Sequence, residues 1–161
     1  MLKVVSNTTP IISLLKISKL EILKNLYDEI FIPNAVYEEL EAGLNKEYYK
    51  DLTQINWINI VPIKSKSSHK YFIDLDKGEA EAIILATEIQ ADLIIIDEKI
   101  GRYYANHADL KVTGTLGVLL KAKKEGLIKE IKPILNELII KGIWISDKLY
   151  KELSSLAGEC D

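Results

Sequence analysis

The chain has 161 residues, of which 48% are hydrophobic, and a formal net charge of −3 at pH 7. These values predict one globular domain over residues 1–161, and no apolar run is long enough for a membrane span or a signal peptide. The single cysteine, Cys160, can form no internal disulfide, which favours a reducing, cytoplasmic setting, and the negative charge argues weakly against a large nucleic-acid footprint.

Apolar strands and helices alternate along the chain without tight hairpin signals. Strands are predicted at 4–6, 30–33, 57–61, 93–96 and 111–113. Helices are predicted to start at Thr9-Pro10 and after a cap at Asn34, with others at 20–26, 76–89, 115–126, 133–141 and 147–156, a helical turn at 101–106, and an exposed basic loop at 64–70. Such alternation predicts a three-layer α/β/α fold with a parallel sheet.

Asp97 ends a run of hydrocarbon side chains that extends from Leu93 to Ile96. Such a run is typical of a strand that is buried on both faces of a parallel sheet. Ligands of open α/β sheets bind just beyond the carboxyl ends of the strands. We therefore expect Asp97, its neighbour Glu98, and Asn7 after the first strand to face one crevice, although a turn role explains Asn7 equally well.

Glutamates near the predicted helix starts are candidates to join this crevice. Glu39 borders the apolar face of its helix, whereas Glu38 is expected to be solvated. Asp76 and Glu79 fit a capping box, which gives Glu79 a structural role. Glu81 has no such role and projects from an almost wholly apolar helix, where a carboxylate needs a partner, so a functional role is favoured for Glu81.

Several carboxylates around one crevice favour Mg²⁺ or Mn²⁺ over zinc, since the chain has few histidines and no usable cysteine. The chemistry that such a site serves best is phosphoryl transfer, in which metal ions activate water and neutralise the phosphate charge. His69 and His107 are interpreted as surface residues.

Five segments together resemble the PIN-domain proteins, and more closely the branch grouped with VapC-type toxins: residues 4–12, 33–40, 75–83, 96–102 and 113–123. The resemblance implies a PIN fold with four or five parallel strands and a metal-dependent ribonuclease activity. It places the acids of the family at Asn7, Glu39, Glu81 and Asp97, with Glu79 and Glu98 as neighbours and Arg102 in a Gly-Arg pair. It also implies a homodimer and a cognate antitoxin, contacts that the helices after about residue 130 are placed to make. PIN nucleases typically carry Asp where this chain has Asn7.

The first hypothesis is a Mg²⁺- or Mn²⁺-dependent endoribonuclease with a metal site of Asn7, Glu39, Glu81 and Asp97. Hydroxyl and basic side chains are predicted to hold RNA phosphates: Thr8, Thr9, Lys99, Arg102, Lys64, Lys66 and Lys70. The alternative is a catalytically weak or silent PIN-fold module that binds RNA or protein, because Asn7 brings no charge to the site. A phospho-receiver domain ranks below both, because the acid pair of its first strand is missing.

Overall fold

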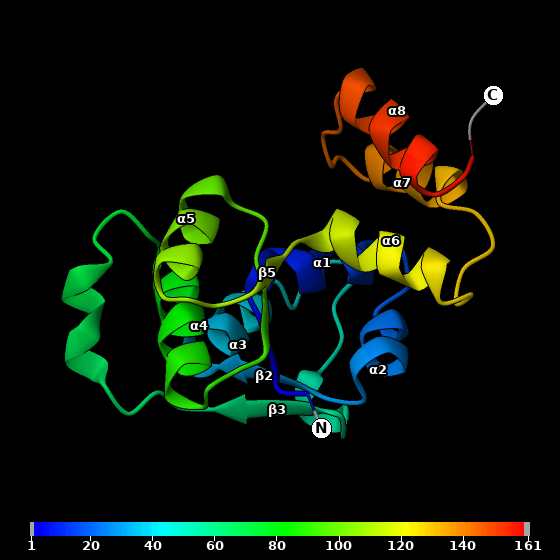
Figure 1. Cartoon of the computed structure of the whole chain (residues 1–161). Helices are drawn as coiled ribbons and strands as arrows, with labels where there is room; N and C mark the ends of the chain where they lie inside the picture. Colours follow the sequence, from blue (N-terminus) through cyan, green and yellow to red (C-terminus); the bar gives the residue numbers. More distant parts are fainter. Residues whose placement is uncertain (1, 160–161) are drawn as a thin grey trace.

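The computed structural model describes residues 2–159, without the side chain of Tyr71, so Cys160 lies outside the described residues. Its centre is a five-stranded sheet in the order β3-β2-β1-β4-β5, in which all neighbouring strands are parallel (Figure 1). The strands are β1 (Val4–Ser6), β2 (Ile30–Pro33), β3 (Ile58–Val61), β4 (Leu93–Ile95) and β5 (Val112–Thr113). The predicted parallel sheet is confirmed.

Helices connect the strands and continue after the last of them. They are α1 (Thr8–Lys16), α2 (Glu21–Tyr27), α3 (Asn34–Glu41), α4 (Lys77–Glu88), α5 (Lys99–His107), α6 (Thr115–Lys124), α7 (Lys132–Ile140) and α8 (Asp147–Leu156). Two short 3-10 helices, η1 (Leu52–Gln54) and η2 (Lys66–Tyr71), flank β3.

Neighbouring strand residues pack into different cores, because successive side chains of a strand point to opposite faces. Val4 and Ile95 belong to the core that includes α1, α2 and α6, whereas Val5 and Ile94 belong to the core under α4. All four side chains are fully buried. The sheet is therefore covered on both faces, and the predicted three-layer α/β/α fold is confirmed.

Several predicted element boundaries are wrong, and capping explains two of them. Helix α1 begins at Thr8, one residue before the predicted cap, because Asn7 is extended (φ −80°, ψ 174°) and takes the N-cap position. Pro33 takes that position before α3, so Asn34 is helical and does not cap. The predicted turn at 101–106 is a nine-residue helix, α5, and most of the predicted basic loop is η2.

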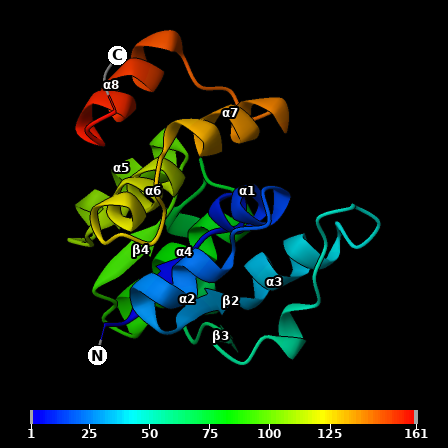
Figure 2. The same ribbon diagram turned by 90° about the vertical axis from the view of Figure 1, so that its right-hand side faces the viewer.

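The last two helices, α7 and α8, lie side by side beyond α6 in both views (Figures 1 and 2). Buried Leu135, Leu138 and Leu153 attach them to the larger core. Within residues 2–159, no helix combines the length and apolar character that crossing a membrane requires.

Candidate active site

The carboxyl ends of β1 and β4 lie next to each other at the centre of the sheet. Ser6 pairs with Ile95, and the backbone N–H of Asn7 donates to the Ile95 carbonyl at 2.9 Å. The chain leaves β1 toward β2 on one side of this point and leaves β4 toward β5 on the other. Ligands of open α/β sheets bind at such a switch point, and Asn7, Asp97 and Glu98 emerge there as predicted.

Asn7 is buried, with 2% of its surface exposed. Its side-chain Nδ2 donates to Glu98 Oε2 at 3.3 Å, whereas its Oδ1 is buried without a hydrogen-bond partner among residues 2–159. Leaving a buried polar atom unpaired costs about 1–3 kcal/mol. Asn7 Oδ1 is thus a buried acceptor without a hydrogen-bond partner among residues 2–159, and it makes no capping bond to α1.

Two threonines at the start of α1 hold carboxylates of this site. Thr8 Oγ1 donates to Glu39 Oε2 at 2.5 Å, and Thr9 Oγ1 donates to Glu98 Oε1 at 2.7 Å. These hydroxyls were predicted to contact RNA. In the structure they hold these two carboxylates, a role that the sequence prediction missed, and their contact with RNA stays a prediction.

Glu39 reaches the first turn of α4 because that turn carries a glycine. The backbone N–H of Gly78 donates to Glu39 Oε1 at 3.1 Å. A Cβ atom at residue 78 would overlap the Glu39 carboxylate, so a larger residue there would displace it. A glycine at the start of a predicted helix is the sequence signal that could have revealed this contact.

Glu98 repels the carboxylates of both Glu39 and Glu79. Burial raises the pKa of Glu79 to about 8, helped by a hydrogen bond with Asp76 and by the negative charges of Asp76 and Glu98. Burial also raises the pKa of Glu39, and the negative charges of Asp76 and Glu98 raise it further. The hydrogen bonds from Thr8 and Gly78 lower this pKa, but the net shift is upward. We call Asn7, Glu39, Glu79 and Glu98 the acid cluster.

Asp97 borders the acid cluster and faces α6. Its Oδ1 accepts from the Thr115 N–H and its Oδ2 from the Thr115 hydroxyl, both at 2.7 Å. A Cβ atom at Gly114 would lie 2.6 Å from Asp97 Oδ1, so the absence of a side chain there makes room for the carboxylate. Thr115, which the sequence prediction missed, directly follows the glycine that ends β5.

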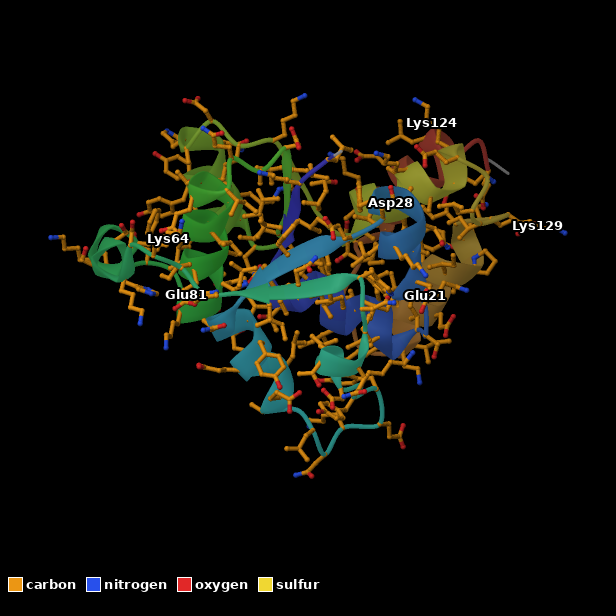
Figure 3. The ribbon with its side chains drawn as sticks, turned by 90° about the horizontal axis from the view of Figure 1, so that it is seen from below. Glu21, Asp28, Lys64, Glu81, Lys124 and Lys129 are labelled. Carbon is orange, nitrogen blue, oxygen red and sulfur yellow. The ribbon has the colours of Figure 1, made fainter. Side chains whose placement is uncertain are left out.

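Glu81 has partners of its own on another side of α4. Its Oε1 accepts from the Ala35 N–H in the first turn of α3 at 3.0 Å, and its Oε2 lies 3.2 Å from Nε2 of His69 in η2. Figure 3 labels Glu81 near Lys64, beside η2. These contacts give Glu81 the partners that a buried carboxylate needs, its predicted functional role stays a prediction, and His69 is half-buried rather than fully exposed.

Glu79 has its predicted structural role. Asp76 caps α4 as predicted, since its Oδ1 accepts from the Glu79 N–H at 2.8 Å. A backbone hydrogen bond from Asp76 to the Glu79 carboxylate lowers the pKa of Glu79 and completes the predicted capping box. The Glu79 carboxylate also lies where a Cβ atom of Gly101 in α5 would touch it, at 3.0 Å.

The predicted RNA-binding cations separate into two groups. Arg102 is exposed on α5, and Lys99 is exposed at the start of the same helix, which follows the acid cluster directly. Lys66 instead lines a pocket with Glu81 and His69, in the segment that also contains Lys64 and Lys70. Lys99 and Arg102 therefore lie on the helix that follows the acid cluster, whereas the cations of residues 64–70 lie in or next to η2.

The donor set of the acid cluster fits a hard divalent cation, because every candidate ligand is an oxygen. The free, buried Asn7 Oδ1 is the observation that favours such a ligand. The carboxylates are engaged in hydrogen bonds as they stand, and no three His, Cys, Asp or Glu side chains of residues 2–159 are grouped to hold a metal ion. Binding would therefore require these carboxylates to exchange hydrogen bonds for metal contacts.

Comparison with known proteins identifies the family of this chain. The model of a PIN-domain family matches residues 3–159. No match was found among curated proteins or among solved structures. PIN domains are generally metal-dependent nucleases, so the family assignment supports a nuclease or nucleic-acid-binding function. Because the match covers nearly the whole chain, and the parallel sheet and its strand-end acids agree with it, the chain belongs to the PIN-domain family.

Proposed function

We propose that this protein is an endoribonuclease that cleaves RNA with Mg²⁺ or Mn²⁺ held by Asn7, Glu39, Glu79 and Glu98. The observation that carries the proposal is the buried, unpartnered Oδ1 of Asn7, whose Nδ2 donates to the Glu98 carboxylate at the sheet's switch point. A bound divalent ion supplies an activated water and neutralises charge on the phosphate. PIN-family membership supports the nuclease class.

Residues around the cluster orient the groups that act on RNA. Thr8 and Thr9 hold Glu39 and Glu98, and Thr115 holds Asp97 with two hydrogen bonds, so these carboxylates have defined directions before RNA binds. Arg102 provides a cation near Asp97 that can bind a phosphate of the RNA backbone. Asp97, which directly precedes Glu98 of the acid cluster, and Arg102 both lie close to Gly114.

Two buried glutamates of α4 provide a matched test of this assignment. Glu79 and Glu81 expose 8% and 7% of their surfaces and lie two residues apart, but only Glu79 belongs to the acid cluster. Glu79→Gln should lower the rate of cleavage of a labelled single-stranded RNA in MnCl₂ by about 100-fold or more, since even outer partners of a metal site matter 10- to 100-fold. Glu81→Gln should change it little, because glutamine can still accept from Ala35.

Equal loss of activity in both variants, with both folded, would contradict the assignment of Glu79. Unchanged cleavage in Glu79→Gln would remove the acid cluster from the reaction.

A second candidate function is favoured by the hydrogen bonds of the site. Thr115 occupies both oxygens of Asp97, and Asn7 brings an amide donor where PIN nucleases typically have a carboxylate. Such a site suits a PIN-fold module that binds RNA without cleaving it. RNA binding with no turnover in Mg²⁺ or Mn²⁺, even by Asn7→Asp, would favour this function.

We propose from the resemblance to VapC-type proteins that the nuclease acts as a toxin, forms a homodimer and is inhibited by a cognate antitoxin. The exposed side chains of Ile139 and Ile140 on α7 offer an apolar surface for such contacts. Arrest of bacterial growth on expression, abolished by Glu79→Gln, is the expected result. Growth that continues despite active nuclease would contradict the toxin role.

A further inference from the structure

A pocket of about 430 Å³ opens beside the acid cluster. Thr9 and Asp97 line its inner side, and Leu138, Ile143 and Leu149 of the α7–α8 region form an apolar wall. Pockets for small ligands are typically of this size and combine apolar walls with a few polar groups. The pocket thus shares two residues with the site and extends it toward the last two helices.

Trp144 stands at this pocket in the loop between α7 and α8. Its side chain is 84% exposed, whereas the next residue, Ile145, is 8% exposed and belongs to the core. The loop is therefore anchored by Ile145 while the indole stays in solvent. A single exposed apolar residue needs no explanation by itself. Trp144 and Asp97 line the same pocket, so the flat indole ring lies next to the proposed reaction site.

Arg102 provides the positive charge of the same pocket. A Cβ atom at Gly114 would lie 2.6 Å from Asp97 Oδ1 and 3.8 Å from Arg102 Nη1, which places the guanidinium close to the carboxylate. Among residues 2–159, Arg102 forms no ion pair within 4.0 Å. Guanidinium groups bind phosphate through two parallel hydrogen bonds, so this arginine is available for a backbone phosphate.

We propose that this pocket binds one unpaired nucleotide of the RNA, with its base stacked on Trp144 and a phosphate on Arg102; the proposal rests on the nuclease function proposed above. A flat aromatic surface, an apolar wall and a cation are the chemistry that recognises a single-stranded nucleotide. A base within a duplex is already stacked on its neighbours and cannot enter the pocket. The pocket therefore selects single-stranded RNA and positions the strand beside Asp97.

The two tryptophans of the chain allow a direct test by intrinsic fluorescence. Trp57 is 7% exposed in the core, so a base that stacks on Trp144 should quench only the exposed residue. A single-stranded 12-mer RNA, added in low salt with EDTA to prevent cleavage, should quench the native protein. Trp144→Phe should show no quenching. A duplex of the same sequence, or a free mononucleotide at equal concentration, should quench far less.

Affinity measured by the anisotropy of the labelled 12-mer gives the second readout. Trp144→Ala should weaken RNA binding on the order of tenfold, because base stacking on an aromatic side chain contributes about that much. Ile73→Ala is the matched control, since Ile73 is 83% exposed but does not line the pocket. Arg102→Gln should weaken binding and reduce its dependence on salt.

Native affinity in Trp144→Ala, quenching that persists in Trp144→Phe, or equal quenching by the duplex would each overturn the proposal. The result is distinguishable from failure of the nuclease function, because binding is measured without cleavage. Trp144-dependent binding without cleavage by the native protein in Mn²⁺ would reject the nuclease and support the pocket. Cleavage by the native protein together with RNA binding that does not depend on Trp144 would support the nuclease and reject the pocket.

Discussion

At the scale of single residues, Asn7 determines how much negative charge the acid cluster carries. Its amide donates to Glu98 and leaves Oδ1 free, so it lessens repulsion among the carboxylates while still offering an oxygen to a cation. An aspartate at this position would lose the donor and add a fourth carboxylate. Stability without metal and affinity for metal should therefore change in opposite directions.

Asn7→Asp should lower the free energy of unfolding in EDTA by about 1–3 kcal/mol, because Glu98 loses its donor and a further buried charge appears. The same variant should gain more thermal stability from MnCl₂ than the native protein does, since binding to the folded state alone stabilises it. Calorimetry in EDTA and in MnCl₂ measures both effects. Asn25→Asp, the same change at an exposed site of α2, is the control. Equal stability of Asn7→Asp and the native protein in both buffers would contradict this role of Asn7.

At the scale of elements, helix α4 carries two buried glutamates that contact different helices, Glu81 at α3 and Glu79 at α5. The helical pattern of the sequence shows that Glu81 projects from an apolar helix and needs a partner, and the structure confirms that need. The pattern of one helix cannot show which neighbour lies on each side. The Ala35 N–H in the first turn of α3 donates to Glu81, whereas the Glu79 carboxylate lies beside Gly101 of α5, so the two side chains have different neighbours.

Glu159, which follows α8, attaches the α7–α8 pair to the rest of the protein through hydrogen bonds and an ion pair. The loop between these two helices carries Trp144. The Glu159 carboxylate accepts from the Ile131 N–H at 2.6 Å and the Lys132 N–H at 3.1 Å, and it pairs with Lys123 Nζ at 3.0 Å. Burial raises the pKa of Glu159, but these backbone bonds and the ammonium group lower it more, so the net pKa is below its ordinary value of 4.5. The charged form therefore stabilises the attachment of α8 to α6 and α7.

Glu159→Gln should reduce the free energy of unfolding at pH 7 by about 1.5–3 kcal/mol, the range of hydrogen bonds to a charged group. A lowered pKa in the folded state means that this stability is present above pH 4.5 and is lost as the pH falls below it. The difference between the native protein and the variant, measured by urea unfolding, should thus shrink from pH 7 to pH 3. Glu152→Gln, an exposed change on α8, is the control. A difference that stays constant with pH would contradict the prediction.

At the scale of the whole molecule, the sequence predicts the fold better than the site. Buried runs such as 93–96 alternate with helices, and this alternation is sufficient to predict a parallel sheet covered on both faces. Asn7, Asp97 and Glu98 follow from the same reasoning, because strand ends of a parallel sheet share one edge. Contacts between elements that are distant in the sequence, such as those of Thr115 with Asp97 or Glu81 with Ala35, depend on three-dimensional packing that no local pattern encodes.

The central claim is that the acid cluster holds a divalent cation, and a crystal structure grown in MnCl₂ tests it most directly. The anomalous scattering of Mn²⁺ should give a peak within coordination distance of Asn7 Oδ1 and of carboxylate oxygens from Glu39, Glu79 and Glu98. A peak beside Glu81 and His69 instead, or no peak at the cluster at saturating Mn²⁺, would contradict the claim.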